Sequence, residues 1–112
     1  IPICEGSKKG HQLISGNTIR RFLTRDNFKN GLGWMMDTEN SFMKEAPSGS
    51  FGHTGFTGTS IVVVPECKLS VILLINRQNK GLTTKGEYLN LSPLRQELFQ
   101  IARQLCETDG GK

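Results

Sequence analysis

The sequence lacks the closely spaced cysteines that mark a metal or redox site. Cys4, Cys67 and Cys106 are spread along 112 residues, and the two histidines, His11 and His53, complete no ligand pattern with them. Metal-binding and redox cysteines ordinarily occur as closely spaced pairs. We therefore expect no metal and no cofactor, and we interpret the cysteines as unpaired, mostly buried thiols rather than as a disulfide framework.

Long hydrophobic runs are also missing. The longest apolar runs, 61–64 and 71–75, are far shorter than the roughly 20 residues that cross a bilayer. No charged leader precedes an apolar stretch, so no signal peptide is visible. The sequence begins at Ile1 rather than at a methionine, which leads us to expect a fragment of a longer protein.

Aromatic residues make up only 7% of the chain, and none alternates with the basic residues. The formal net charge is +4, and the basic excess lies early, at Lys8, Lys9, Arg20, Arg21, Arg25 and Lys29. A surface that binds single-stranded nucleic acid combines basic residues with aromatic stacking platforms. Because such platforms are absent, we interpret the basic residues as one solvated helix face and expect no nucleic-acid partner.

Two helical patterns are present. Ser15 is a suitable cap for a helix over 16–25, in which the apolar residues fall on one face. Ser92 and Pro93 provide a cap and a first helical position for a closing helix that continues to about Cys106.

Strand patterns occur at 31–37, 51–57, 59–64 and 69–76. The polar stretch 38–50 is expected to be a surface loop, and Pro65 is expected to begin a turn over 65–68. The predicted fold is α+β, with an antiparallel sheet of three carboxy-terminal strands and an upstream GLGW strand, flanked by helices.

The strand pattern at 69–76 is almost continuously apolar, which predicts burial on both faces of the sheet. Two helices supply too little cover for two such faces. We therefore expect that part of the fold is absent, and we disfavour the alternative of a self-sufficient small basic protein.

Three glycines, Gly52, Gly55 and Gly58, are spaced three apart in the first of these carboxy-terminal strands and just after it. Glycine is normally excluded from strands because it packs nothing and carries an entropic cost. At the edge of a sheet, this spacing indicates that something approaches the backbone closely.

The sequence GHTG at 52–55, followed by strand, turn, strand and helix, resembles the carboxy-terminal part of the serine β-lactamase and penicillin-binding-protein superfamily. NGLGW at 30–34 is similar to the GLGW of class C β-lactamases and related esterases. LISGNTIRRFL at 13–23 and VVVPECKLSVILLINR at 62–77 resemble a helix start and a hairpin of the same enzymes. The resemblance implies that 1–112 is the carboxy-terminal part of a single β-lactamase/transpeptidase-like domain.

That family acylates a serine and carries the motifs S-x-x-K, Y-x-N and K-T-G. This chain has the third motif in the form H-T-G. Short matches to the other two run from Ser41 to Lys44 and from Tyr88 to Asn90. The first lies just before His53 and the second after it, which is the wrong order, so we interpret both as chance. The two missing motifs are expected in an amino-terminal part that this sequence does not contain.

The resemblance gives roles to four residues of the H-T-G strand. Phe56 follows the motif, and its backbone amide would be one of the two donors to the oxyanion. His53, a catalytic and substrate-binding candidate, and Thr54 would face the pocket. Gly55 would leave room for a substrate that lies along the strand.

The family's lysine helps to hold a substrate carboxylate, whereas an imidazole is mostly neutral near pH 7. The histidine therefore favours esterase, amidase or peptidase activity over β-lactam hydrolysis. The resemblance implies a serine acyl-enzyme hydrolase that acts outside the cytoplasm on a β-lactam, ester or D-amino-acid peptide substrate.

By itself the chain is expected to be inactive, because the nucleophile and base would come from the missing amino-terminal part, which is the partner we expect. The alternative is a non-catalytic module of the same fold that binds a peptide or a partner strand along its glycine-rich edge.

Overall fold

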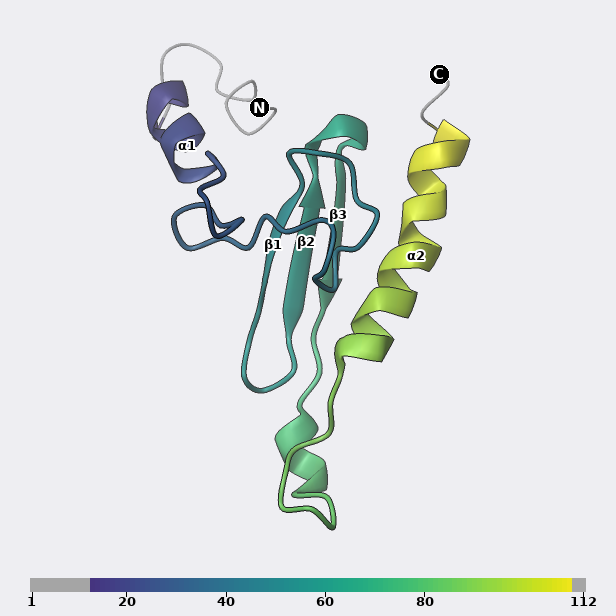
Figure 1. Ribbon diagram of the computed structural model, residues 1–112. Helices are drawn as coiled ribbons and strands as arrows, with labels where there is room; N and C mark the ends of the chain where they lie inside the picture. Colours follow the sequence, from purple (N-terminus) through teal and green to yellow (C-terminus); the bar gives the residue numbers. More distant parts are fainter. Residues whose placement is uncertain (1–12, 110–112) are drawn as a thin grey trace.

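The structure is a computed structural model that describes residues 13–109 (Figure 1). The elements, in chain order, are α1 (Gly16–Phe22), β1 (Phe51–Thr54), β2 (Ser60–Val64), η3 (Pro65–Cys67), β3 (Leu69–Leu73), η4 (Arg77–Lys80) and α2 (Ser92–Asp109), where η marks a 3-10 helix. This composition confirms the α+β class. Cys4, His11, Lys8 and Lys9, on which the sequence raised expectations, lie outside the described residues.

The three strands form one antiparallel sheet in the order β1-β2-β3. In the register of the sheet, Ile61 of β2 lies between His53 of β1 and Ile72 of β3. Because side chains alternate between the faces of a sheet, these three residues share one face, and the neighbouring Val62 is turned to the other.

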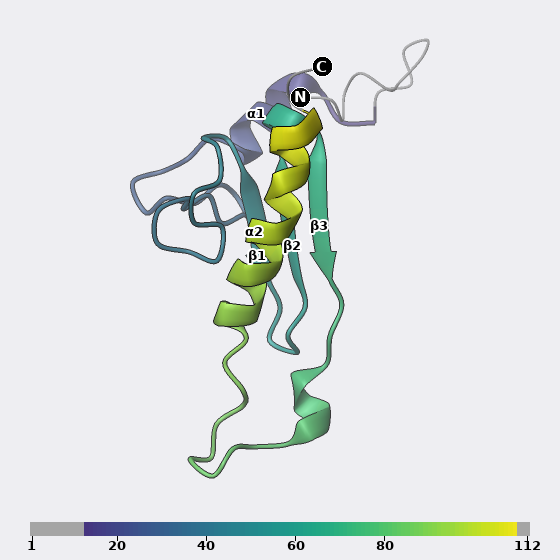
Figure 2. The same ribbon diagram turned by 90° about the vertical axis from the view of Figure 1, so that its right-hand side faces the viewer.

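The core lies on the Val62 face, between the sheet and α2 (Figure 2). Phe99 of α2 is 1% exposed and packs in one cluster with Val62 and Val64 of β2. α2 runs along the sheet in both views and is longer than its sequence pattern indicated, since it continues past Cys106 to Asp109.

The prediction that 38–50 is a surface loop is only partly right, because part of this stretch is buried. It contributes four buried residues, Phe42, Met43, Ala46 and Ser50, three of which belong to the core cluster with Phe99. The stretch is polar on average, but its apolar side chains have no regular period, and irregular backbone folded over the sheet brings them inward. Its remaining residues are exposed, as Lys44 and Glu45 are, or partly buried, as Ser41 is.

The interpretation of the cysteines as unpaired thiols is wrong for two of the three. Cys67, at the end of η3, forms a disulfide with Cys106 of α2, and the two are 39 residues apart in the sequence. The disulfide therefore joins the closing helix to the β2–β3 connection. Sequence spacing could not indicate this pairing, because it is created by the packing of α2 on the sheet.

The upstream GLGW strand expected at 31–37 is not a regular strand. Two isolated bridges replace it, one between Asn30 and Met35 and one between Met35 and Gly52 of β1. Gly33 has φ +75°, in the left-handed region that turns the chain rather than extending it. The segment therefore forms a tight turn that touches the edge of the sheet at one residue.

β3 is shorter than predicted, and its apolar residues are not buried on both faces. Ile72 is 60% exposed, and Leu74, just beyond the strand, is 80% exposed. Both belong to the stretch whose continuous hydrophobicity predicted burial. Within the described residues, nothing covers these two side chains fully.

α1 begins as the sequence predicts but ends early. The Ser15 side chain accepts a hydrogen bond from the Thr18 N–H, and the helix stops at Phe22 rather than at residue 25. Downstream of it, Lys29 forms ion pairs with Glu39 (2.9 Å) and Asp37 (3.9 Å), and Arg25 pairs with Glu39 (3.6 Å). Part of the early basic charge is therefore neutralised within the fold.

No helix within the described part of the chain is both long enough and apolar enough to cross a membrane.

Candidate active site

β1 is the edge strand that carries the H-T-G sequence. On its outer side, Gly52 exchanges two backbone hydrogen bonds with Met35, at 2.8 and 2.9 Å. Alternate residues of an antiparallel strand bond to opposite sides, so Thr54 also directs its N–H and C=O to the outer side. Among the described residues, Met35 makes the last backbone hydrogen bond on this side, and beyond it the Thr54 N–H has no backbone partner while the Thr54 carbonyl oxygen lies near the His53 ring.

His53 lies on the sheet face opposite α2, beside Ile61, and its side chain is exposed. Its Nδ1 is 2.8 Å from the carbonyl oxygen of Thr54. A shallow cavity of about 350 Å³ opens at this point, lined by His53, Thr54, Gly55, Thr59, Ser60, Ile61, Ile72 and Leu74. The structure thus brings three of the four predicted site residues to one hollow.

The fourth, Phe56, lies in the turn that follows β1, and the residue is 63% exposed. The turn is closed by hydrogen bonds from the Gly55 N–H to the Thr59 carbonyl oxygen (2.8 Å) and from the Gly58 N–H to the Gly55 carbonyl oxygen (3.0 Å). Among the hydrogen bonds of residues 13–109, none uses the Phe56 N–H. The predicted oxyanion donor is therefore available at the end of the edge strand.

A Cβ at any of the three glycines would meet the protein's own atoms, so they have a packing role within the chain; that Gly55 leaves room for a substrate stays a prediction. A Cβ on Gly55 would meet the Thr59 hydroxyl, and a Cβ on Gly52 would meet the Ile61 carbonyl oxygen and the Met43 sulfur. Gly58 has φ +117°, and a Cβ there would lie 2.7 Å from Leu91. The spacing of three is explained by packing within the chain.

Two arginines that the sequence did not single out surround this turn. Arg77 Nε donates to the Phe56 carbonyl oxygen (2.7 Å), and Arg95 Nη2 lies 3.5 Å from the Gly55 carbonyl oxygen. Their positions in the sequence could have indicated them, because Arg77 directly follows the third strand pattern and Arg95 lies in the first turn of the closing helix.

The two chance motif matches have structural roles. The Ser41 hydroxyl donates to the Asp37 carbonyl oxygen and accepts from the Met43 N–H (3.0 Å), so it is engaged within its own loop. The Tyr88 ring makes an edge contact with the Phe56 ring, with 5.4 Å between ring centres. The H-T-G turn therefore has an aromatic neighbour that its sequence neighbourhood did not predict.

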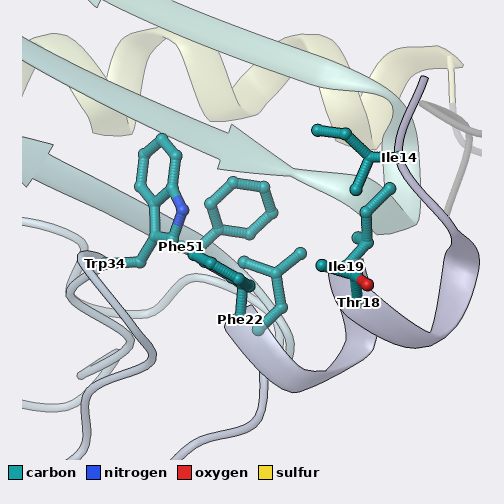
Figure 3. A pocket seen from close by; sticks show the side chains of 7 residues that line it. Ile14, Thr18, Ile19, Phe22, Trp34 and Phe51 are labelled. Atoms are coloured by element: carbon teal, nitrogen blue, oxygen red, sulfur yellow. The ribbon is translucent and has the colours of Figure 1, made fainter.

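A second cavity of about 350 Å³ lies between α1 and Phe51 of β1, which shares a sheet face with His53, and Figure 3 shows its side chains. Trp34 packs edge-on against Phe51, with ring centres 5.0 Å apart, and apolar side chains of α1 face them. Apart from Thr18 and Trp34, the described residues that line the cavity are purely hydrocarbon side chains, and none of them is a charged group, a histidine or a cysteine. Among the described residues, no three His, Cys, Asp or Glu side chains cluster as metal ligands.

The fold and the site together are an antiparallel sheet whose edge strand leads to an amide that no described residue binds, beside a histidine and a threonine. The family model described as Beta-lactamase matches residues 6–92, which is most of the chain. The chain belongs to the β-lactamase family.

Two relatives from Escherichia coli carry the name "Putative D-alanyl-D-alanine carboxypeptidase". The one from strain O157:H7 is 32% identical over 86 residues, and the one from strain K12 is 31% identical over 86 residues. Each match covers 71% of this chain and 20% of the relative, so the chain spans about a fifth of the length of these curated relatives. No solved structure matches the chain significantly.

Proposed function

We propose that this chain is the carboxy-terminal segment of a serine acyl-enzyme hydrolase. It would supply the H-T-G strand, one oxyanion donor and a wall of the pocket, while the nucleophilic serine, its base and the tyrosine motif come from an amino-terminal part of the same domain. Membership of the β-lactamase family supports this assignment, and so does the fraction of the relatives that the chain spans.

The observation that carries the proposal is the N–H of Phe56, which no residue of 13–109 binds. Acyl transfer through a serine ester develops negative charge on the substrate's carbonyl oxygen, and preorganised backbone donors stabilise it. The Gly55 N–H bonds inward to the Thr59 carbonyl oxygen, so the N–H groups of Thr54, at the end of β1, and of Phe56, in the turn after it, would both be directed to the outer side. A substrate carbonyl at Phe56 would therefore leave the rest of the substrate alongside Thr54 as an added strand.

His53 and Thr54 would contact the substrate beside the reacting bond. Both line the open cavity at the end of β1, and an imidazole and a hydroxyl can each donate or accept a hydrogen bond. The apolar residues of the same cavity, Ile61 and Ile72, provide a surface for the hydrophobic part of an ester or an acyl peptide. We favour an ester, amide or D-amino-acid peptide over a β-lactam, since no lysine stands in the motif.

We propose that the complete protein acts outside the cytoplasm. Two of the three cysteines form a disulfide, and disulfides persist in oxidising compartments. The names of the two relatives refer to D-alanyl peptides, which agrees with a substrate from the cell wall.

Replacement of Phe56 by proline in the complete protein tests the proposal, because proline has no N–H. Loss of one oxyanion donor is expected to lower kcat for a chromogenic ester by about 10²- to 10³-fold. Phe56→Ala, which removes the ring and its contacts with Tyr88 and Arg77 but keeps the N–H, is the matched control and should reduce kcat much less. Equal rates for Phe56→Pro and the parent, with both folded, would remove Phe56 from the site.

A second candidate is a non-catalytic module that binds a peptide along the edge of β1, and the open edge at Thr54 favours it. Such a module would bind an extended peptide but would not be acylated by a fluorophosphonate. The two functions are therefore separated by covalent labelling of the complete protein.

A further inference from the structure

Two arginines hold the turn that presents the Phe56 amide. Arg95, in the first turn of α2, is 9% exposed, and its Nη2 lies 3.5 Å from the Gly55 carbonyl oxygen and 3.4 Å from that of Thr59. Arg77, after β3, donates from Nε to the Phe56 carbonyl oxygen at 2.7 Å. The turn is thus held from the helix and from the end of the sheet.

Arg95 is a buried cation without a matching anion in the described part of the chain. None of the ion pairs between described side chains includes it, and its Nε has no hydrogen-bond partner among them. Burial, and then the charge of Arg77, lower the pKa of Arg95. An unpaired buried charge is costly for stability. The contacts of Arg95 with the Gly55 and Thr59 carbonyl oxygens therefore explain its position better than a gain in stability does.

The contact with Gly55 fixes the direction of the Phe56 N–H. The Gly55 C=O and the Phe56 N–H belong to one planar peptide unit, and every peptide unit in the described chain is trans. In a trans unit the two groups point in opposite directions. Because the Gly55 oxygen is directed inward, toward Arg95 and the Gly58 N–H, the Phe56 N–H is directed outward.

Arg77 restrains the next peptide units in the same turn. Its side chain binds the Phe56 oxygen, and its own backbone N–H donates to the Thr57 oxygen at 2.8 Å. Its guanidinium carbon lies 5.0 Å from the Phe56 ring centre and 5.7 Å from that of Tyr88, within the range of cation–π contacts. A further bond from Nη1 to the Leu89 oxygen (3.2 Å) ties this group to the loop before α2.

We propose that Arg95 and Arg77 are positioning residues for the Phe56 amide: Arg95 aims the N–H at the open edge, and Arg77 keeps the following peptide from rotating. The inference rests on the proposed role of Phe56 in acyl transfer. Arg95 has a second effect, because a positive charge on the Gly55 oxygen polarises the shared peptide unit and makes the Phe56 N–H a stronger donor.

Residual dipolar couplings of the complete protein test the geometry directly, because the coupling of the Phe56 N–H depends on its direction relative to the sheet. In Arg95→Met, the coupling of Phe56 should depart from the value of the parent chain while those of β2 stay unchanged. Gln96→Met, at the exposed neighbouring position, is the matched control and should leave all of them unchanged. Arg95→Lys keeps the charge without the planar fork and should give an intermediate coupling.

An unchanged Phe56 coupling in folded Arg95→Met would overturn the proposal. If that variant does not fold, Arg95→Lys takes its place, and an unchanged Phe56 coupling there overturns the role of Arg95. In Arg77→Met the coupling to follow is that of the Thr57 N–H, in the peptide unit whose oxygen Arg77 binds, and an unchanged value overturns the role of Arg77.

In the complete protein, Arg95→Met should lower kcat by roughly 10- to 100-fold with KM within about twofold, because a misaimed donor weakens transition-state binding. If the parent protein hydrolyses no ester at all, the proposed function fails, while the dipolar couplings still decide whether the arginines position the amide.

Discussion

The disulfide between Cys67 and Cys106 gives the most quantitative prediction for this chain. The bond closes a loop of 39 residues, which includes β3, η4 and most of α2. In the chain-entropy description, a loop of this length stabilises the folded state by about 4 kcal/mol, because it restricts the unfolded chain. That is a large share of the roughly 5–15 kcal/mol by which domains of this size are stable.

Cys67→Ser is therefore expected to lower the free energy of unfolding by about 4 kcal/mol at most. With a urea dependence of about 2 kcal/mol per molar, the midpoint should fall by about 2 M. Far-UV circular dichroism in urea follows the transition, and the parent chain treated with a reductant should match the variant. Cys4→Ser retains the disulfide and should remain as sensitive to the reductant as the parent chain.

The reasoning would be refuted if Cys67→Ser and the reduced parent chain unfolded at the same urea concentration as the oxidised parent. Such a result would mean that the packing of α2 against β3 and the core cluster holds the helix without covalent help.

Three further predictions concern stability. Phe99→Ala empties the centre of the core, where Phe99 is 1% exposed, and should cost about 3–5 kcal/mol in urea unfolding; a loss below 1 kcal/mol would contradict the assigned core. Backbone N–H groups of Glu39 and Asn40, and then Lys29, lower the pKa of Asp37 below its ordinary 3.8. The charged form is therefore favoured by folding, so its contribution is complete above pH 3.8 and is lost as the pH falls through the lower folded-state value. Asp37→Asn should be less stable than the parent at neutral pH and equally stable in strong acid, as measured by thermal unfolding across pH; a constant difference would contradict the assignment. Gly58→Ala combines a φ of +117° with a close contact to Leu91 and should cost about 1–3 kcal/mol, measurably more than Gly86→Ala, whose added Cβ meets nothing.

Local signals predicted those parts of the fold that local chemistry determines. Ser15 caps α1 through its hydroxyl, and Pro65 begins a tight turn between two apolar strands. Both depend on residues within a few positions of one another. The antiparallel order of the three strands follows from their short connections in the same way.

Features created by long-range packing could not be predicted. Met43 is fully buried although it lies in a polar stretch, because the loop folds back over the sheet toward Phe99. The pairing of Cys67 with Cys106 arises from the same docking of α2. The Gly31–Asp37 segment was misread because a left-handed glycine, Gly33, turns a chain whose composition is typical of a strand.

At the candidate site, the resemblance supplied His53, Thr54, Gly55 and Phe56, and the structure places the first three at one cavity and the last in the turn beside it. Arg95 was missed because its partners are backbone carbonyl groups about 40 residues away in sequence, which no side-chain pattern records. The reason first given for the glycines was also incomplete, since Thr59 and Leu91 occupy the space that they leave.

The most direct test of the central claim is to label the native protein with a fluorophosphonate in its source cells and detect it with an antibody to this segment. The account predicts a labelled band several times larger than the 12.4 kDa of this chain, with the modified serine outside residues 1–112. An unlabelled band at the size of the chain itself would contradict the account and leave a small binding module of the β-lactamase family.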